Sequence, residues 1–352
     1  MKNMNLEEYK GVFVYAQQVD NVLSGISFEL LGKAKDLAKD LNTNVTAVLV
    51  GSDVKGLCDK LAEYGADRVI VVDDPELKAY RTEPYTHALA SVINEYKPEI
   101  MLVGATAIGR DLCPRVSARV ATGLTADCTV LEIGDFPLNP MPGREQKHNQ
   151  LLMTRPAFGG NTIATIACPN HRPQMATVRP GVMKALEKDA SKTGEVKVLD
   201  VALSAADMNV EILDEVKETK KSVDITEAKV LVSGGRGIGS AKGFDMLREC
   251  AAELGGEVAS SRSCVDAGWI ESDRQVGQTG KTVRPELYIA CGISGAIQHV
   301  AGMENSEFVV SINKNDTAAI FSVSDLGVVG DVNVIIPKLT EALKKYNAEK
   351  NN

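Results

Sequence analysis

The feature that most constrains this chain is a repeated alternation of short apolar runs with longer segments whose apolar residues recur at helical spacing. Residues 11–16, 45–50, 68–72 and 100–104 are predicted strands. The segments between them, such as 28–41, are predicted helices because their apolar residues fall on one helical face. Strands that alternate with helices favour a mostly parallel sheet covered by helices. We therefore expect an α/β, Rossmann-like domain in the first half.

Further along the first half, a pair of strands is predicted at 125–132 and 151–155. The Pro-, Gly- and polar-rich stretch 136–150 between them is too polar to pack, so we expect an exposed excursion there.

The same alternation restarts late in the chain. A strand at 229–232 precedes a Gly-rich turn and a helix over 244–254, and further strands are predicted at 258–259, 287–290 and 308–312. Asp331 is a candidate cap for a closing helix. A second mostly parallel sheet covered by helices is therefore expected.

These two regions set the expected domain boundaries. Residues 206–227 are dense in charge and poor in large apolar residues, as in a linker. A length of 352 residues also favours two domains over one. We predict an N-terminal domain over 1–205, a linker over 206–227, a second domain over 228–346 and a frayed tail over 347–352.

Composition excludes several classes of function. With 39 basic and 47 acidic residues, the net charge of -8 gives no overall attraction to nucleic acid or anionic membranes. No apolar run reaches the roughly 18 residues that a spanning helix needs, so no membrane insertion is expected. The seven cysteines form no CxxC pair, and we expect buried thiols, no metal site and a cytoplasmic protein. The sequence shows no pair of carboxylates that would suggest catalytic residues.

The first candidate binding element is the glycine-rich turn 233–239, which follows a strand and precedes a helix. Such a turn directs backbone N–H groups and the positive helix end toward one point, as in a phosphate cradle. The match to GxGxxG fails because Ser240 stands where the third glycine is required, and Glu257 precedes its strand instead of ending it. A nicotinamide dehydrogenase is therefore disfavoured, although an ordinary tight turn would use the same glycines.

A second strand-turn-helix junction lies at 292–299 and offers another set of N–H groups and a hydroxyl. Two such turns suit a dinucleotide. The GxSxG pattern of a nucleophile elbow is incomplete because Ala296 occupies the last glycine position, which argues against a hydrolase. His299 taken alone is more typical of a structural histidine than of a ligand.

Between the two turns lies an apparent loop at 276–280 with basic residues around it. Arg262, Arg274, Lys281 and Arg284 in an acidic protein suggest a bound anion, whereas the alternative is a solvated basic face.

These motifs together resemble one family. Residues 287–302, which read LYIACGISGAIQHVAG, are similar to the signature of electron-transfer flavoprotein α subunits. The segments 233–237, 261–268, 275–281 and 312–314 also resemble the family. In the first domain, 104–115 and 159–161 do so too, so the resemblance covers nearly the whole chain. One departure is Ser311, where the signature has Ala.

The resemblance implies a binding site for FAD in the C-terminal domain. The following residues stand at positions that line FAD in the family: Arg236, Ser261, Arg262, Val276, Gly277, Gln278, Thr279, Ser294, Gly295, Ala296, Ile297, Gln298, His299, Asn313, Asp331 and Val332.

The family also implies roles for some of these residues. Thr279 is expected to reach the flavin N5, and Asn313 and Asp331 to lie toward the adenosine end. Arg262 and His299 are expected near the flavin edge, where they would stabilise the negative charge of one-electron reduction. At an effective dielectric of about 20, one such charge would shift the flavin potential by on the order of 100 mV.

The resemblance further implies an electron carrier that acts as an oxidoreductase only within a heterodimer with a β subunit. Electrons would pass to or from an acyl-CoA dehydrogenase-type or quinone-linked partner, as in fatty acid β-oxidation. The segments 154–161 and 268–270 resemble the anaerobic bacterial branch, some members of which bifurcate electrons from NADH with a second FAD on the β subunit. The sequence of this chain leaves open whether the protein is one of these bifurcating members. The rival interpretations are an NAD-dependent dehydrogenase and a non-catalytic adenine-nucleotide-binding module.

Overall fold

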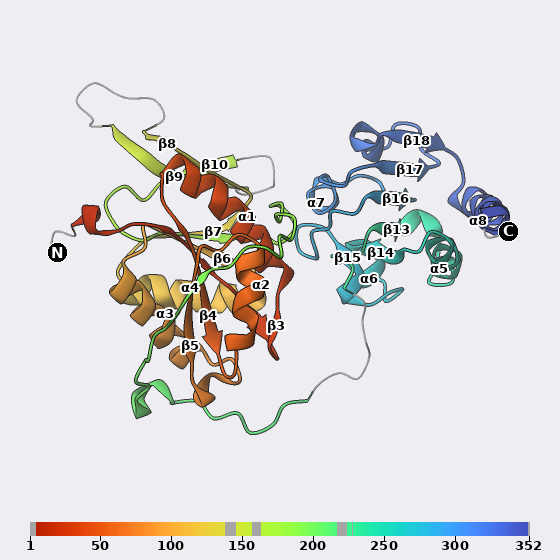
Figure 1. Cartoon of the computed structure of the whole chain (residues 1–352). Coiled ribbons are helices and arrows are strands. Elements are labelled where there is room, and N and C mark those ends of the chain that lie inside the picture. Colours follow the sequence, from red (N-terminus) through yellow and green to blue (C-terminus); the bar gives the residue numbers. More distant parts are fainter. Residues whose placement is uncertain (1–4, 138–145, 157–162, 217–223, 227, 351–352) are drawn as a thin grey trace. The chain divides into compact units, whose positions relative to one another are not determined.

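The computed structural model describes residues 5–137, 146–156, 163–216, 224–226 and 228–350. The chain separates into two compact units, Met1–Glu215 and Val216–Asn352, which are described one at a time (Figure 1). Among the described helices, none is both long and apolar enough to cross a bilayer.

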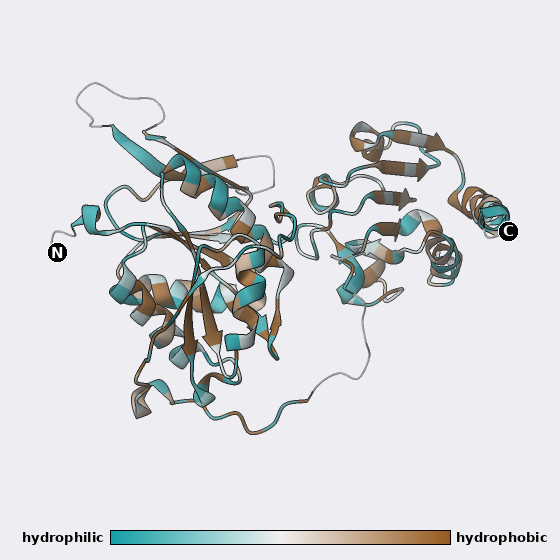
Figure 2. Ribbon diagram, viewed as in Figure 1, coloured by the Kyte–Doolittle hydropathy of each residue, from teal (hydrophilic) through white to brown (hydrophobic). Residues whose placement is uncertain are grey.

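The first unit is built on a seven-stranded sheet whose strand pairs are all parallel. In order across the sheet, the strands are β12 (Glu195–Val198), β5 (Arg68–Asp73), β4 (Val45–Gly51), β1 (Val12–Tyr15), β6 (Ile100–Gly104), β11 (Gln174–Val178) and β7 (Leu124–Cys128). The central strands β4, β1 and β6 are buried along their whole length and mostly apolar, as expected for a sheet covered on both faces, and brown predominates in this region of Figure 2. A short hairpin of β2 (Gln18–Val19) and β3 (Val22–Leu23) follows β1.

Helices cover the two faces of this sheet. Leu30 and Leu37 of α1 (Gly25–Asp40) and Leu61 of α2 (Cys58–Glu63) pack in one core cluster. Leu89 of α3 (Thr82–Tyr96) and Leu112 of α4 (Ala107–Arg119) pack in a second cluster on the other face. The predicted α/β fold with mostly parallel strands is therefore confirmed for this unit.

A second, antiparallel sheet in this unit contains β8 (Val130–Phe136), β9 (Lys147–Pro156) and β10 (Ile163–Ile166). The predicted single strand over 125–132 is wrong, because its first part is β7 of the large sheet. Within β7, where the register of its pairing with β11 shifts, Asp127 adopts a left-handed φ of 61° and forms a bidentate ion pair with Arg179 at 2.6 and 3.2 Å. The predicted excursion 136–150 is also too long, because β8 and β9 extend into it; 138–145 and 159–161 lie outside the described residues.

The second unit holds a six-stranded sheet whose strand pairs are also all parallel. In order, the strands are β15 (Gln275–Val276), β14 (Glu257–Ser261), β13 (Val230–Gly234), β16 (Leu287–Cys291), β17 (Val309–Asn313) and β18 (Leu326–Val329). The helices are α5 (Gly243–Glu253), α6 (Arg262–Asp266), α7 (Ile297–Val300) and α8 (Val332–Lys350). The strand order reverses direction between β13 and β16, and open α/β sheets bind ligands at the carboxyl edge of such a switch point.

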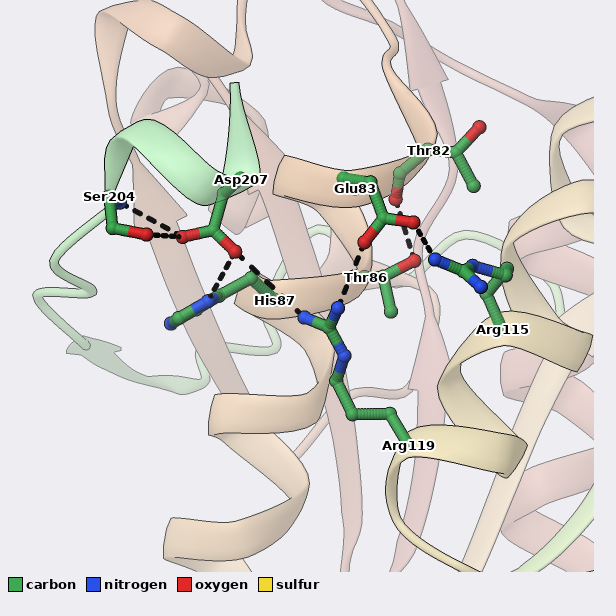
Figure 3. A network of polar contacts seen from close by, with 8 residues as sticks. All are labelled: Thr82, Glu83, Thr86, His87, Arg115, Arg119, Ser204 and Asp207. Carbon is green, nitrogen blue, oxygen red and sulfur yellow. Dashed lines mark hydrogen bonds and ion pairs between the residues drawn. The ribbon is translucent and has the colours of Figure 1, made fainter. Parts of the chain in front are cut away.

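Both ends of the predicted linker 206–227 belong to the compact units. At the start, Asp207 accepts hydrogen bonds from the Ser204 N–H and hydroxyl at 2.9 and 2.6 Å, and pairs with His87 of α3 at 2.9 Å (Figure 3). At the end, Ile225 is fully buried and Asp224 pairs with Lys281 at 2.9 Å. These contacts place residues near both ends of 206–227 within the units and not in the segment that connects them.

The C-terminal end also differs from expectation. Helix α8 continues to Lys350, and the Asn347 side-chain amide donates to the Glu253 carbonyl at 2.9 Å, so the helix extends into the predicted tail. Asp331 caps α8 as predicted, accepting from the Asn333 N–H at 3.0 Å. All seven cysteines are free thiols, and Cys168 alone among them is more than slightly exposed.

Candidate functional site

A cavity of about 620 Å³ lies at the carboxyl edge of the second sheet, over the switch point between β13 and β16. Its wall comes from the segment after β13 (235–237), the end of β14 and the residues after it (261–266), β15 and the residues after it (275–279), the segment after β16 (292–299) and the last residue of β17. The volume lies within the range of small-molecule and cofactor pockets. The fold therefore brings segments up to about 80 residues apart in sequence to one site, as parallel strands do at their shared carboxyl ends.

The two glycine turns contact each other through their backbones at the floor of this cavity. The Gly235 N–H donates to the Cys291 carbonyl at 2.9 Å, and the Gly237 N–H donates to the Gly292 carbonyl at 3.0 Å. A Cβ on Gly235 would lie 2.4 Å from the Gly292 oxygen, and one on Gly237 would lie 2.7 Å from Gly292 Cα. No other residue type fits at either position.

This contact corrects one expectation about the first turn. The N–H groups of Gly235 and Gly237 bind the second turn, so they do not form the free phosphate cradle that the sequence suggested. Helix α5 begins only at Gly243, several residues after the turn, so its N-terminus does not follow the turn directly. Arg236 remains on the cavity wall and supplies positive charge there.

The second turn meets the cavity more directly. Ser294, Ala296 and Gln298 line it, and the short helix α7 begins beside them at Ile297. The first N–H groups of any helix lack partners within the helix, so they are suited to bind oxygen atoms of a ligand. Gly295, at φ 87°, instead packs closely against the 3-10 helix Ala319–Val323, where an added Cβ would lie 2.1 Å from the Ile320 nitrogen.

Most of the residues predicted from the sequence come together at this site. Those that line the cavity are Arg236, Ser261, Arg262, Val276, Gly277, Gln278, Thr279, Ser294, Ala296, Gln298, His299 and Asn313. Four predicted residues, Gly295, Ile297, Asp331 and Val332, do not contribute to its wall. Asp331 is the cap of α8 and pairs with Lys314 at 3.0 Å, whereas Val332 is buried in the core.

Several lining residues were missed by the sequence reasoning, namely Gly235, Gly237, Ser263, Asp266, Gln275, Gly292 and Ile293. Most of them adjoin predicted residues, and the two glycines of the first turn were visible as part of the motif. Gln275 begins the segment 275–281 that resembles the family but was not among the predicted site residues; its side-chain amide donates to the Thr279 hydroxyl at 3.0 Å and so orients that hydroxyl.

The basic residues between the turns do not form one anion site. Arg274 pairs with Glu257 at 2.7 Å, and Lys281 pairs with Asp224 at 2.9 Å. Neither these two nor Arg284 lines the cavity, so the prediction of a shared anion site is wrong for them. Arg262 does line it, with its side chain 66% exposed and 3.4 Å from Asp266. Water screens so exposed a charge more strongly than the effective dielectric of about 20 assumed above. The electrostatic effect of Arg262 on a bound ligand is therefore weaker than that value implies.

His299 lines the cavity as predicted, with its imidazole buried. Its side chain is buried, with the residue only 6% exposed, and burial lowers the pKa of the imidazole to about 4. Its Nε2 lies 3.0 Å from the Tyr288 hydroxyl and its Nδ1 lies 3.1 Å from the Val276 carbonyl oxygen. The ring is therefore neutral at pH 7, and both nitrogens already have partners within the protein.

The wall of the cavity suits a phosphate-containing dinucleotide. The backbone approaches closely at the glycine contact, where no side chain would fit. Ser261, Ser294 and Thr279 offer hydroxyls, and the guanidinium groups of Arg236 and Arg262 offer positive charge. The residues present thus fit FAD, whose pyrophosphate needs donors and whose rings need a wide, partly apolar pocket.

Comparison with known proteins agrees with this site. Residues 12–204 match the family model described as electron transfer flavoprotein domain, and residues 224–304 match the electron transfer flavoprotein FAD-binding domain. The electron transfer flavoprotein subunit alpha of Thermoanaerobacterium thermosaccharolyticum is 52% identical over 340 residues, covering 97% of this chain and 99% of that protein. The protein of the same name from Clostridium acetobutylicum is 49% identical over 346 residues, covering 98% and 100%.

A relative with a more specific name extends the comparison. The lactate dehydrogenase (NAD(+),ferredoxin) subunit LctC of Acetobacterium woodii is 41% identical over 331 residues, covering 94% of this chain and 76% of that protein. The matches span both units and include the segment that forms the cavity. The chain therefore belongs to the electron transfer flavoprotein α-subunit family, whose C-terminal domain binds FAD.

Proposed function

We propose that this protein holds FAD in the cavity of its second unit and carries single electrons between a dehydrogenase and a second redox partner. The observation that carries the proposal is the cavity itself, formed where the two glycine turns meet at the β13–β16 switch point. FAD supplies the redox chemistry, because its ring system accepts electron pairs and releases electrons singly.

The residues of this chain bind and orient the cofactor. We assign the pyrophosphate to the Ser294 turn and Arg236, where hydroxyl, backbone and guanidinium donors gather. Thr279, oriented by Gln275, faces the cavity and is assigned to the flavin N5. Arg262 and His299, which both line the cavity, are assigned to the flavin edge.

The remaining assigned residues have different tasks. Asn313 donates from its side-chain amide to the Ile293 carbonyl at 2.8 Å, so it shapes the second turn from the cavity wall. Asp331 and Val332 are proposed to act on the adenosine end indirectly, by fixing the start of α8.

The partner we propose is an electron-transfer flavoprotein β subunit, in a heterodimer. The acryloyl-CoA reductase electron transfer subunit beta of Anaerotignum propionicum is 44% identical over 358 residues, so a dehydrogenase of the acyl-CoA type is a proposed electron partner. The relative named as a subunit of an NAD- and ferredoxin-linked lactate dehydrogenase supports the anaerobic, NADH-oxidising branch. In that branch the β subunit would hold a second FAD.

We also propose that the two units correspond to a partner-binding domain and an FAD-binding domain joined by a linker shorter than 206–227. The contacts of Asp207 in the first unit and of Ile225 in the second support the shorter linker. Seven free thiols suit a reducing compartment, so we place the heterodimer in the cytoplasm.

Co-expression with candidate β subunits tests this function. We expect the purified heterodimer to be yellow, with flavin released on denaturation. One FAD with AMP favours the simple carrier, and two FAD per heterodimer favour the bifurcating branch. A colourless heterodimer that refuses added FAD but binds ATP or AMP would instead favour the nucleotide-binding module, and hydride exchange with NADH without flavin would favour the dehydrogenase.

A further inference from the structure

Ser311 stands where the family signature has Ala, and its hydroxyl has a partner inside the protein. The residue lies on β17 and is fully buried, so an unpaired hydroxyl there would be costly. The Ser324 hydroxyl oxygen lies 2.6 Å from the Ser311 hydroxyl oxygen. The serine therefore adds a buried hydrogen bond that an alanine could not form.

The Ser324 hydroxyl links Ser311 to a neighbouring 3-10 helix. Its oxygen also lies 2.7 Å from the carbonyl oxygen of Ile320, in the 3-10 helix Ala319–Val323. A hydroxyl has one proton and a carbonyl oxygen only accepts, so Ser324 donates to Ile320 and Ser311 donates to Ser324. The two hydrogen bonds thus join the interior of β17 to the 3-10 helix.

The 3-10 helix is in turn joined to the second glycine turn. The N–H of Ile320, a residue that is 1% exposed, donates to the Ser294 carbonyl at 3.1 Å. A Cβ on Gly295 would lie 2.1 Å from the Ile320 nitrogen and 2.6 Å from the Ala319 carbonyl carbon. Because no space separates the two segments, a shift of the 3-10 helix would displace the Ser294 turn on the cavity wall.

We propose that Ser311 is a positioning residue for the pyrophosphate of FAD: its hydroxyl holds the 3-10 helix, and the 3-10 helix holds the Ser294 turn. Ser311 does not line the cavity, so its effect on the cofactor must pass through these segments. Strand β17 also holds the turn directly, through the hydrogen bond from the Asn313 amide to the Ile293 carbonyl at 2.8 Å. The inference rests on the proposed function, which assigns the pyrophosphate to this turn.

The first experiment measures the FAD dissociation constant of the intact heterodimer with Ser311→Ala. Only the hydroxyl is removed, and Ala is the residue of the family signature, so we expect the variant to fold. The dissociation constant should rise by a factor of about two to ten, the net contribution of one hydrogen bond. Ser27→Ala is the matched control, because Ser27 is also fully buried and donates to the Gln17 carbonyl at 3.2 Å in the first unit. The control should bind FAD like the wild type, and equal binding by Ser311→Ala would overturn the proposal.

A double-mutant cycle tests whether Ser311 acts through Ser324. Ser324→Ala should weaken FAD binding more than Ser311→Ala does, because it leaves both the Ser311 hydroxyl and the Ile320 carbonyl without this partner. Adding Ser311→Ala to Ser324→Ala should cause no further loss, because the orphaned hydroxyl is then removed as well. A further loss as large as that seen in the wild-type background would mean that Ser311 acts by another route, and the proposal would be wrong.

A third measurement separates positioning of the pyrophosphate from a general effect on stability. In the ³¹P spectrum of the heterodimer saturated with FAD, Ser311→Ala should shift the pyrophosphate resonances of the FAD in this cavity. The one-electron potential of the flavin should stay unchanged, because the Ser294 turn is assigned to the pyrophosphate and not to the ring system. Unmoved phosphorus resonances would contradict the proposal, whether the potential changes or only the unfolding stability falls.

These experiments also separate this inference from the function on which it rests. Failure of the wild-type heterodimer to bind FAD would refute the proposed function and the role of Ser311 together. A wild type that binds FAD, with a Ser311→Ala variant that binds it equally well, would refute the role of Ser311 alone.

Discussion

The contact between the two glycine turns gives the sharpest prediction, tested by Gly237→Ala. The added Cβ would lie 2.7 Å from Gly292 Cα and 2.8 Å from the Gly292 oxygen. Both contacts are backbone atoms, so no side chain can move aside to relieve them. The turns must separate, which weakens the 3.0 Å hydrogen bond from the Gly237 N–H to the Gly292 carbonyl. Overpacking of this kind costs about 1–3 kcal/mol.

Denaturant unfolding and FAD titration of the heterodimer measure this cost. We expect lower stability of the second unit and FAD affinity weaker by a factor of about 5 to 150 if the whole cost falls on binding. Gly25→Ala is the control, because a Cβ there meets no atom within 4 Å at the start of α1. If Gly237→Ala unfolds and binds FAD like the wild type, the turns do not form the floor of the site as described.

Three further predictions concern charged side chains. Arg262→Ala should lower the one-electron potential of the flavin by about 40 mV, the value for a unit charge screened as in water, and an unchanged potentiometric titration would remove Arg262 from the account. Arg274→Ala is expected to leave that potential unaltered, since Arg274 pairs with Glu257 away from the cavity; a comparable shift would contradict the assignment. Asp207→Ala should destabilise the first unit by about 1–2 kcal/mol in thermal unfolding, because it removes the partner of Ser204 and His87. Hydrogen bonds from Ser204 lower the pKa of the Asp207 carboxyl to about 2. The stability that this carboxylate gives the first unit is therefore present above about pH 4 and is lost as the pH falls toward 2. This loss should be missing when the unfolding free energy of the variant is measured over the same pH range.

Asp207 also belongs to a network of ion pairs with residues that the Asp207→Ala variant does not remove. Glu83 of α3 pairs with both Arg115 and Arg119 of α4, and Arg119 lies 3.9 Å from Asp207 (Figure 3). The start of the connecting segment is thus fixed to two helices of the first unit. Motion of the FAD-binding domain, if it gates electron transfer, would have to begin after Asp207.

The sequence predicted those parallel strands that read as continuous apolar runs, such as β4 and β6, whereas the buried strand β11 was missed because Gln174 and Thr177 interrupt its apolar run. Residues 100–104 were predicted with the same bounds as β6. The edge strands β15 and β18 were missed, since one has only two residues and the other is half exposed. The break between β7 and β8 was missed because the two strands pair with distant segments in different sheets, β11 and β9, which the sequence pattern does not show.

The site was predicted less completely than the fold, for a similar reason. Local motifs identified the glycine turns and their hydroxyls, which need only short-range geometry. Whether an N–H, a cation or an imidazole is free depends on partners elsewhere in the chain. The Gly237 N–H donates to the Gly292 carbonyl, Arg274 forms an ion pair with Glu257, and the His299 ring is within hydrogen-bonding distance of the Tyr288 hydroxyl. None of these pairings is visible as a spacing in the sequence.

The most direct measurement of the central claim is a crystal structure of the heterodimer purified with its FAD. The account predicts that density for the dinucleotide fills the cavity between the turns at 235–237 and 292–299, with Thr279 and Arg262 beside the flavin ring. Density for FAD elsewhere on this chain, or only on the β subunit, would contradict it.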